Sequence, residues 1–361
     1  MTLSEQEKNR YSRHLLLDKV GLEGQLKLKN AKVLVIGAGG LGSPVLLYLT
    51  AAGVGTIGIV DFDLIEESNL QRQVLFNAKD IGKSKAITAQ EKLQLQNPLI
   101  KINAYDFALT NKNAIDLFEE YDIVIDGTDN FNTRYLVNDA CVLTNTILVY
   151  GAIYKFEGQV AVFNYLNGPT YRCLFPEPPK KGSVPSCSEV GVLGVLPSLI
   201  GSMQANEAIK IIIGIGKTLS NNLLIYNSLT NSQTEVAIEK NFNLESIGIK
   251  TRADFEEYNY PEFCSISEES ETKNKRTIFT DLTQDAFILD VREEWEQPRL
   301  THSNILIAPL DSLDDFANVI PKDGDVFVVC QKGGRSQMAI DFLEKEYNFE
   351  NLINVEGGVL S

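Results

Sequence analysis

The fold is decided by one stretch, Lys32-Val33-Leu34-Val35-Ile36-Gly37-Ala38-Gly39-Gly40-Leu41-Gly42. An apolar, β-branched run that breaks into glycines and then resumes as the apolar residues 43–49 predicts a strand, a tight turn and a helix. Gly37 permits the turn, Gly39 lets the backbone approach a phosphate, and Gly42 allows the helix to pack closely. The stretch therefore predicts a phosphate-binding turn. Its glycine pattern alone is shared with NAD- and FAD-binding loops and with turns that bind nothing.

Charged and amide side chains after the loop favour a triphosphate over a dinucleotide. A second strand-like run, residues 56–60, ends in Asp61-Phe62-Asp63, which places a carboxylate about 20 residues past the glycines, where a ribose hydroxyl would lie. The run Ser68-Asn69-Leu70-Gln71-Arg72-Gln73 and the later Lys85 then add amides and long cations. Arg binds phosphate oxygens in pairs and Lys acts as a point charge, and a dinucleotide pyrophosphate has little use for so much positive charge.

The following segments alternate between helix and strand patterns. Helical patterns near 84–96 and 110–120 alternate with strand-like runs near 99–105 and 121–126. This order predicts a mainly parallel sheet with covering helices, whose strands bind ligands at their carboxyl ends. The last run delivers Asp129 to such an end, where it can face a nucleotide or cap the helix beginning near Phe131, with Asn130 as an alternative cap.

Residues 147–165 and 223–239 are each typical of a pair of strands, with turns near 157–158 and 230–231. Between the pairs lie a glycine- and proline-rich loop and a strongly apolar helix, from about 196 to 213. Antiparallel strands after a parallel set predict an extension of the same sheet. The fold class is therefore a Rossmann-like α/β domain with an antiparallel extension, in which the apolar helix is buried or forms a dimer interface. We expect a homodimer.

The chain is long enough for two domains, and its composition changes once along its length. We expect a first domain over 1–245, a polar linker without apolar periodicity over 246–276, and a small α/β domain over 277–361. Two buried-looking strands, near 286–293 and 325–330, carry the small domain.

Charge and cysteine content exclude several classes of protein. The 33 basic and 48 acidic residues give a net charge of −15, which disfavours binding to nucleic acid or to an anionic membrane. The N-terminus lacks the apolar core of a signal peptide, and no apolar run is long enough to span a membrane. The 5 cysteines are an odd number at irregular spacing, which suits free thiols in a reducing compartment. We expect a cytoplasmic protein.

Cys330 begins the run Cys330-Gln331-Lys332-Gly333-Gly334-Arg335-Ser336, which leads into a helical pattern. A thiol at a strand end, followed by a glycine-bearing loop and a helix N-terminus, is surrounded by backbone N–H groups. Together with Arg335 these groups would stabilise a thiolate. The alternative is a buried cysteine at a strand end without a chemical role.

The Asp-x-Asp, Ser-Asn-Leu-x-Arg-Gln and later Lys motifs resemble those of the adenylate-forming enzymes related to ubiquitin-activating enzyme, of the molybdopterin-synthase and thiamine-biosynthesis adenylyltransferase type. The resemblance covers residues 1 to about 245 and implies adenylation, with ATP and magnesium, of a ubiquitin-like sulfur carrier that ends in Gly-Gly. It assigns the reaction to Arg13, Arg72, Lys85, Asp129 and Cys187. It assigns the nucleotide to Gly37, Gly39, Gly40, Gly42, Asp61, Asp63, Ser68, Asn69 and Asn130.

The resemblance also implies particular roles for three of these residues. Arg13, in the helical pattern of residues 7–17, would reach the triphosphate of the neighbouring subunit. Asp129 would hold magnesium. Cys187 would form a thioester or disulfide with the activated partner, and the alternative for it is an incidental exposed thiol.

Residues 277–361 resemble a rhodanese domain, whose cysteine carries sulfur as a persulfide. Dual-specificity phosphatases share this loop but have one more residue between Cys and Arg than separates Cys330 from Arg335, which favours sulfur over phosphate. The resemblance thus implies that the Cys330 persulfide converts the carrier adenylate to a thiocarboxylate. The sulfur would come from a donor such as a cysteine desulfurase. Molybdenum-cofactor, thiamine and tRNA-thiolation pathways all use this chemistry.

Two cysteines show where the resemblance fails. Many relatives bind structural zinc through two Cys-x-x-Cys pairs, but Cys173 and Cys264 each lack a partner at that spacing, and two thiolates are half of a tetrahedral site. We therefore expect no structural zinc. Two rival functions stay open at this point: an NAD-dependent oxidoreductase, and a sulfur or redox sensor in which nucleotide sets the conformation without turnover.

Overall fold

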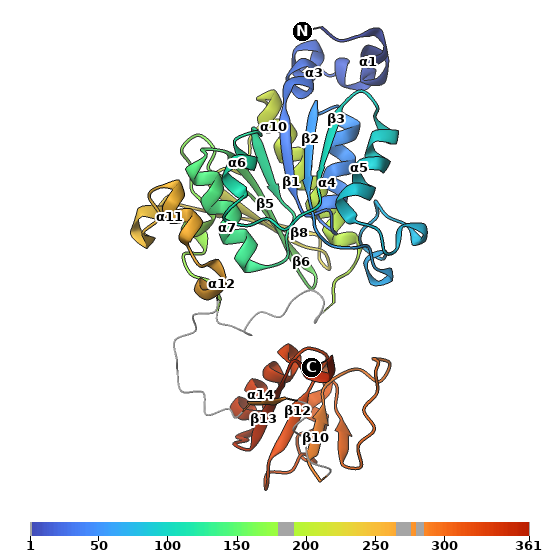
Figure 1. The fold of residues 1–361 in the computed structure, drawn as a ribbon, viewed down its shortest axis with the longest axis vertical. Coiled ribbons are helices and arrows are strands. Elements are labelled where there is room, and N and C mark those ends of the chain that lie inside the picture. Colours follow the sequence, from blue (N-terminus) through green and yellow to red (C-terminus); the bar gives the residue numbers. More distant parts are fainter. Residues whose placement is uncertain (1, 180–190, 265–275, 279–284, 361) are drawn as a thin grey trace. The chain divides into compact units, whose positions relative to one another are not determined.

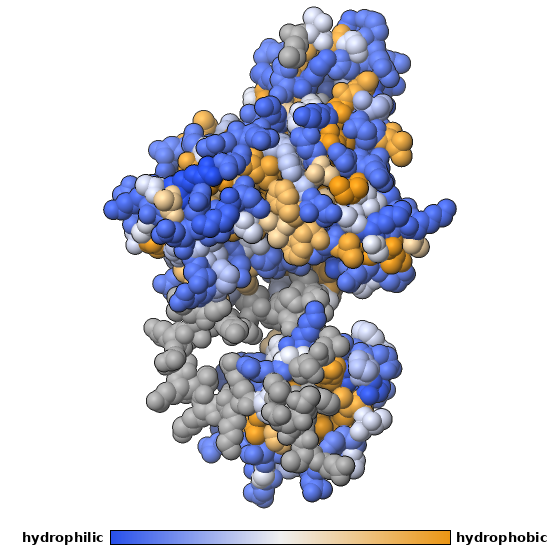
Figure 2. All heavy atoms as spheres, viewed as in Figure 1, coloured by the Kyte–Doolittle hydropathy of each residue, from blue (hydrophilic) through white to orange (hydrophobic). Residues whose placement is uncertain are grey.

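The computed structural model describes residues 2–179, 191–264, 276–278 and 285–360 (Figure 1). The described chain forms two compact units. One comprises residues up to 178 together with 191–264, and the other contains the residues after 264. No helix of the described part is long and apolar enough to cross a membrane. The face of the first unit in view in Figure 2 is mostly hydrophilic, with hydrophobic residues scattered over it.

The first unit is built on an eight-stranded sheet of order β3-β2-β1-β4-β5-β6-β7-β8. The parallel strands are β1 (Lys32–Ile36), β2 (Thr56–Val60), β3 (Lys101–Tyr105), β4 (Ile123–Asp126) and β5 (Ile147–Tyr154). The antiparallel extension is β6 (Glu157–Phe163), β7 (Asn222–Asn227) and β8 (Ser232–Ala237). The sequence prediction of a mainly parallel sheet with this extension is confirmed, although the first hairpin turns at 155–156, slightly before the expected position.

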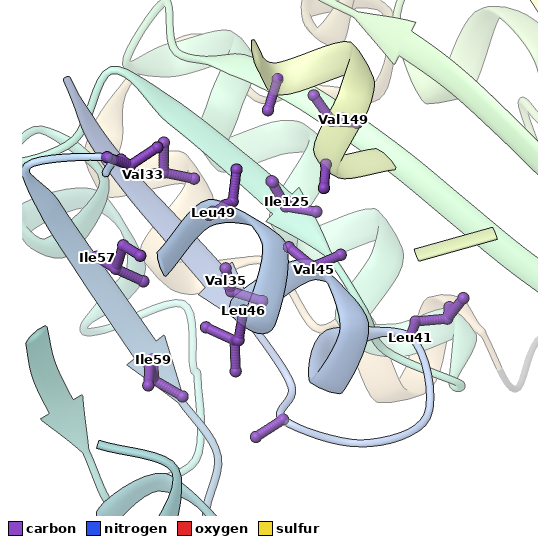
Figure 3. Packing of buried hydrophobic residues seen from close by; sticks show 14 of the residues in the cluster. Val33, Val35, Leu41, Val45, Leu46, Leu49, Ile57, Ile59, Ile125 and Val149 are labelled. Carbon is purple, nitrogen blue, oxygen red and sulfur yellow. The ribbon is translucent and has the colours of Figure 1, made fainter. Parts of the chain in front are cut away.

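Helices cover both faces of this sheet. The larger ones are α4 (Gly42–Ala52), α5 (Lys85–Gln96) and α10 (Val195–Ile213) on one face, with α6 (Ala114–Phe118) and α7 (Phe131–Leu143) on the other. Side chains of β1 alternate between two cores, because Val33 and Val35 lie in the first and Leu34 and Ile36 in the second. Burial on both faces explains why the parallel strands are continuous apolar runs in the sequence. Figure 3 shows the first core.

The N-terminal segment forms short helices, where we expected one over residues 7–17. They are α1 (Glu5–Arg10) and α2 (Ser12–Leu15), followed by α3 (Gly21–Asn30). Tyr11 separates the first two because its side chain is buried: the ring packs against Gly53, and its hydroxyl accepts a 2.9 Å hydrogen bond from Asn97 Nδ2. In Figure 1 these helices lie at the end of the sheet where β1 begins.

The prediction of a linker over 246–276 is wrong for its first half. Residues 244–264 form η3 (Leu244–Ile247), α11 (Arg252–Glu257) and α12 (Tyr260–Phe263), and they belong to the first unit. Phe255 and Tyr260 are buried in the second core of that unit. The prediction was wrong because it gave weight to the charged residues of this segment, whereas its buried aromatic side chains hold it in place. Residues 265–275 lie outside the described part of the chain.

A buried arginine lies under this segment. Arg172, on α8 (Tyr171–Leu174), is 0% exposed and donates two hydrogen bonds to Asp139, from Nε at 2.8 Å and from Nη2 at 2.7 Å. The Tyr260 hydroxyl donates to the same carboxylate at 2.9 Å. The guanidinium carbon also lies 4.7 Å from the ring centroids of Tyr135 and Phe263. We call Arg172, Asp139, Tyr260, Tyr135 and Phe263 the Arg172 cluster.

The second unit is a small α/β domain with a five-stranded sheet of order β11-β10-β12-β13-β9, paired in parallel throughout. Its strands are β9 (Arg276–Ile278), β10 (Phe287–Asp290), β11 (Ile305–Ile307), β12 (Val326–Val329) and β13 (Leu352–Glu356). Its described helices are η5 (Leu310–Ser312), α13 (Leu313–Phe316), α14 (Gly334–Tyr347) and η6 (Gly358–Leu360). The two strands predicted from sequence are β10 and β12, and Cys330 follows β12 directly.

Candidate nucleotide and sulfur sites

The glycine loop lies against the loop that follows β4. Gly37 has φ +91°, and a Cβ there would lie 3.0 Å from the carbonyl oxygen of Gly127. A Cβ on Gly42 would lie 1.8 Å from the Gly37 oxygen, so only glycine fits at the start of α4. The register pairs Ile36 with Val60 and with Asp126, which brings the carboxyl ends of three strands level. Segments far apart in sequence therefore meet at one edge of the sheet.

Asp61 joins the glycine loop to the end of β2. Its Oδ2 accepts the Ala38 N–H at 2.8 Å, and its Oδ1 accepts the Asp63 N–H at 2.9 Å. Burial raises the pKa of the Asp61 carboxyl above its ordinary value, while the nearby Lys85 and these two N–H groups act in the opposite direction. The carboxylate predicted to bind a ribose thus also fixes the shape of the loop that would hold the phosphates.

Lys85 begins α5 and pairs with Asp63. The distance from Nζ to Oδ2 is 2.7 Å, and the Lys85 side chain is 7% exposed whereas that of Asp63 is 52% exposed. The ammonium is therefore almost buried, but its carboxylate partner is largely in water. An incoming polyanion can replace such a partner at little cost, since Asp63 would keep most of its hydration.

The Ser-Asn-Leu-Gln-Arg-Gln run folds beside the glycine loop. Asn69 closes η1 (Glu67–Asn69), because its Oδ1 accepts the Glu66 N–H at 3.2 Å. Arg72 Nη1 donates to the Ser68 carbonyl at 2.9 Å, and a Cβ on Gly40 would lie 3.5 Å from Arg72 Cγ. The run therefore places Arg72 at the glycine loop, and its expected role toward a triphosphate stays a prediction.

Gln73 lies at the candidate nucleotide site, although the sequence analysis gave it no role. It is 3% exposed, its Nε2 lies 3.6 Å from where a Cβ on Gly39 would be, and its buried Oε1 has no hydrogen-bond partner among the described residues. Its position directly after Arg72, in the same run, was the available signal.

The end of β4 settles which residue caps α7. Asn130 is the cap, because its Oδ1 accepts the Thr133 N–H at 2.9 Å. Asp129 is exposed and makes no hydrogen bond or ion pair with any residue that the structure describes. The carboxylate of Asp129 is thus open at the strand end, directly after Gly127 and Thr128, whose backbone lies against Gly37 of the glycine loop.

Arg13 does not join these residues. It is exposed on α2, two residues after Tyr11, which packs against Gly53 at the far end of α4. The glycine loop precedes the first turn of α4, so about 16 Å of helix lies between, at 1.5 Å per residue. Within one chain Arg13 is therefore remote from the glycine loop.

In the second unit, hydrogen-bond donors converge on Cys330. The thiol is 1% exposed, and Sγ accepts from the Gly333 N–H at 3.0 Å and from the Ser336 hydroxyl at 3.4 Å. Gly333 has φ +93°, which turns the backbone into α14. Ser336 also lies 2.7 Å from Asn354 Oδ1 on β13. The sequence analysis gave no role to Ser336 or Asn354, although both are buried, Ser336 contacts the thiol and Asn354 contacts Ser336.

Arg335 is held by a carboxylate that the sequence analysis did not consider. Both of its terminal nitrogens donate to Glu296, at 2.6 Å each, and the two side chains are 12% and 11% exposed. Burial opposes the charge of Glu296, but the hydrogen bonds from Arg335 and from the Glu293 N–H outweigh it and hold the pKa of Glu296 below its ordinary value. A second buried pair, Asp290 with Arg292, connects β10 to the loop through Gln331.

The remaining cysteines bear on metal and relay chemistry. Cys187 lies outside the described residues. Cys173 is buried with its Sγ 3.5 Å from Thr170 Oγ1, and Cys264 is half-buried. Within the described ranges, no group of three or more His, Cys, Asp or Glu side chains could hold a metal ion. The expected lack of structural zinc stays a prediction for metal analysis.

Known proteins resemble the chain over nearly its whole length. The probable adenylyltransferase/sulfurtransferase MoeZ of Mycobacterium tuberculosis is 42% identical and covers 99% of this chain and 93% of its own length. The adenylyltransferase and sulfurtransferase MOCS3 of Culex quinquefasciatus is 38% identical, with 99% of this chain and 87% of that protein covered. The sulfur carrier protein adenylyltransferase of Thermus thermophilus is 52% identical over 67% of this chain and 91% of its own.

A solved structure and a family model both match the first unit and confirm its predicted fold class. The crystal structure of E. coli MccB with ATP superposes with a TM-score of 0.57 at 25% identity, covering 66% of this chain and 73% of that one. The ThiF family matches residues 11–246. That range begins at Tyr11 and ends within η3, so it takes in the whole eight-stranded sheet. The chain therefore belongs to the ThiF family.

Proposed function

We propose that this chain uses ATP to adenylate the C-terminal glycine of a ubiquitin-like sulfur carrier and then transfers persulfide sulfur to it, which gives a carrier thiocarboxylate. It is an adenylyltransferase and a sulfurtransferase. The names of its relatives support both activities, since they are called adenylyltransferase and sulfurtransferase and one is a sulfur carrier protein adenylyltransferase.

The observation that carries the first activity is the open carboxylate of Asp129 beside the glycine loop. Adenylation requires the carrier carboxylate to attack the α-phosphate while pyrophosphate leaves. It depends on alignment and on neutralising the charge of the leaving group more than on a general base. Arg72, Lys85 and Asn69 lie along the segments that meet at the loop. Arg13 would complete the set from the neighbouring subunit of a homodimer, because it is remote from its own chain's loop.

Magnesium fits Asp129 on chemical grounds. The ion prefers carboxylate and phosphate oxygens and keeps several waters, so one solvent-exposed carboxylate next to a triphosphate is a suitable partner. When bound, the ion would neutralise charge on the phosphate oxygens. Asn130 contributes the cap of α7 and would act on the nucleotide only through the position of that helix.

The second activity follows from Cys330. A persulfide on Cys330 attacks the carbonyl carbon of the carrier adenylate, and AMP leaves with the bonding electron pair. The product is an acyl disulfide between the carrier and Cys330. A cellular thiolate attacks the Cys330 sulfur and releases the thiocarboxylate, and a second cellular thiol reduces the mixed disulfide that remains on Cys330. In the alternative route Cys187 acts as a relay: it first displaces AMP to form a thioester with the carrier, and the Cys330 persulfide then attacks that thioester and releases the Cys187 thiolate. A cysteine desulfurase is the class of enzyme that would reload the persulfide.

Exchange of labelled pyrophosphate into ATP tests the adenylation. We expect exchange that depends on a carrier ending in Gly-Gly and falls about 100-fold or more in Asp129→Ala. Cys330→Ala should abolish persulfide formation from thiosulfate and leave exchange intact. Absence of exchange with every sulfur carrier tried would exclude this function. NAD binding would then favour an oxidoreductase, and nucleotide binding without turnover would favour a sensor.

A further inference from the structure

Arg134 lies behind the Asp129 loop and has no role in the chemistry described so far. It is in the first turn of α7, and its Nη2 donates to the Thr128 carbonyl at 3.1 Å. Its guanidinium carbon lies 5.7 Å from the ring centroids of both Phe131 and Tyr150. Its Nε is buried without a hydrogen-bond partner in the described chain. This cation is therefore fixed in place by two rings and one carbonyl.

The loop itself is held at both ends, by the buried Asp126 at one end and by the helix cap Asn130 at the other. Asp126, the last residue of β4, is 1% exposed, and its Oδ1 accepts both the N–H and the hydroxyl of Thr128, at 2.9 and 2.6 Å. The carbonyl of Asp126 accepts from Gln204 Nε2 on α10 at 2.7 Å. Asn130 is held by its cap of α7. Asp129 is thus the exposed apex of a loop whose neighbours on both sides are pinned.

Charge gives Arg134 a second connection to the loop. The carboxylates of Asp126 and Asp129 both act electrostatically on Arg134, as do Tyr150 from β5 and Tyr171 from α8. Two carboxylates so close in the chain repel each other, and a cation that interacts with both and is bonded to Thr128 offsets that repulsion.

We infer that Arg134 is a positioning residue for the adenylation site, which holds the Thr128–Asp129 segment so that the Asp129 carboxylate faces the nucleotide. The inference rests on the proposed role of Asp129. Lysine cannot replace the guanidinium here, since its ammonium is a point charge without a planar face to stack between Phe131 and Tyr150 while donating to Thr128. Arg134→Lys keeps the positive charge but loses the planar guanidinium, whereas Arg134→Met loses both.

The test measures how magnesium affects nucleotide binding. A fluorescent, non-hydrolysable ATP analogue is titrated into the full chain with and without magnesium, in the absence of carrier. For the natural chain we expect magnesium to tighten binding. For both Arg134 variants we expect unchanged binding without magnesium and loss of most of the magnesium effect. Carrier-dependent pyrophosphate exchange should fall roughly 10- to 100-fold in kcat, as for a displaced catalytic group, with an unchanged KM for carrier.

Arg252→Met is the matched control. Arg252 is a surface arginine on α11 that pairs with Asp116 and Glu256, so this variant should match the natural chain in both assays. The inference is overturned if Arg134→Lys keeps the full magnesium effect and full exchange. It is also overturned if Arg134→Lys loses magnesium-free binding together with thermal stability, because Arg134 would then support only the fold. If the natural chain showed no pyrophosphate exchange while magnesium still tightened its binding of nucleotide, that result would contradict the proposed function. The binding measurements on the Arg134 variants would still decide the inference.

Discussion

The two candidate sites differ in how the chain assembles them. The groups around the Cys330 thiol come mainly from one short loop, residues 330–336, which turns directly into α14. The nucleotide site draws on residues 37–42, 61–73, 85 and 126–130, which meet only because β1, β2 and β4 end level with one another. The sulfur site is therefore local in sequence, whereas the nucleotide site exists only in the complete sheet.

The two sites also differ in how their cations are held. Lys85 pairs with Asp63, which is 52% exposed, but Arg335 pairs with Glu296, which is 11% exposed. A solvated carboxylate gives up its cation to a phosphate at little cost, whereas a buried carboxylate would be left without hydration. We propose that Lys85 is available to a ligand and that Arg335 stays with Glu296 and supports the loop.

Replacement of Lys85 should produce the largest effect in this comparison. In Lys85→Met we expect carrier-dependent pyrophosphate exchange to fall by on the order of 100- to 1000-fold, because an electrostatic group next to the leaving pyrophosphate is lost. Exchange is measured at saturating ATP and carrier, and the thermal midpoint of unfolding shows whether the fold is retained.

Asp63→Asn is the control for Lys85→Met. It removes the carboxylate charge and keeps the ammonium, so exchange at saturating ATP should stay within about threefold of the natural chain, because the phosphate that replaces Asp63 gives the nearly buried ammonium its anionic partner. If Asp63→Asn were as inactive as Lys85→Met, the pair itself would be required, and the idea that phosphate replaces Asp63 would be wrong.

Glu296→Gln addresses the buried pair and should have an intermediate effect. Loss of the charge that two Arg335 N–H groups contact should destabilise the second unit by about 3 kcal/mol. Trp295, the single tryptophan of the chain, is adjacent to Glu296, so its fluorescence during urea unfolding reports on this unit. Persulfide formation at Cys330 should fall in parallel with stability.

The pH dependence provides a check on this prediction. The pKa of Glu296 is lowered in the folded protein, so its charge stabilises the fold above the ordinary value of 4.5, and this contribution is lost as the pH falls through the lowered pKa. The difference between Glu296→Gln and the natural chain should be full at neutral pH and should shrink below about pH 4. An equal difference at pH 7 and pH 3 would show that it does not come from this carboxylate.

The sequence predicted what depends on local pattern. The strand, turn and helix of residues 32–52 follow from apolar periodicity and from glycines whose φ and close contacts no other residue tolerates. The loop of residues 330–336 after the Cys330 thiol was predicted for the same reason, since its residues are contiguous in the sequence. The sequence also predicted that Arg72 and the glycine loop act on one nucleotide. The structure brings these two segments together, and their shared ligand stays a prediction.

What the sequence could not predict depends on partners far away in the chain. The bond from Asp61 to Ala38, the pair of Glu296 with Arg335 and the contact of Tyr260 with Asp139 join residues separated by 23, 39 and 121 positions. Each is decided by packing, which residue type and spacing do not encode. The same cause explains why residues 246–264 were wrongly predicted to be a linker. The aromatic residues of α12 are held by the buried Arg172 and Asp139, which lie far away in the sequence.

The smallest predicted effect concerns the Arg172 cluster, whose residues are far apart in the sequence, like those of the nucleotide site. Tyr260→Phe removes one hydrogen bond to a buried carboxylate and should cost about 2 kcal/mol. This corresponds to about 5 °C in the thermal midpoint of a unit of this size. Tyr48→Phe, at a tyrosine that is 57% exposed, is the matched control and should leave the midpoint unchanged. A zinc chelator should shift neither variant nor the natural chain, because we expect the cluster, and no metal, to hold residues 252–264 in place. If the chelator lowered the midpoint of the natural chain while Tyr260→Phe left it unchanged, zinc would be the element that fixes this segment and the cluster would be secondary.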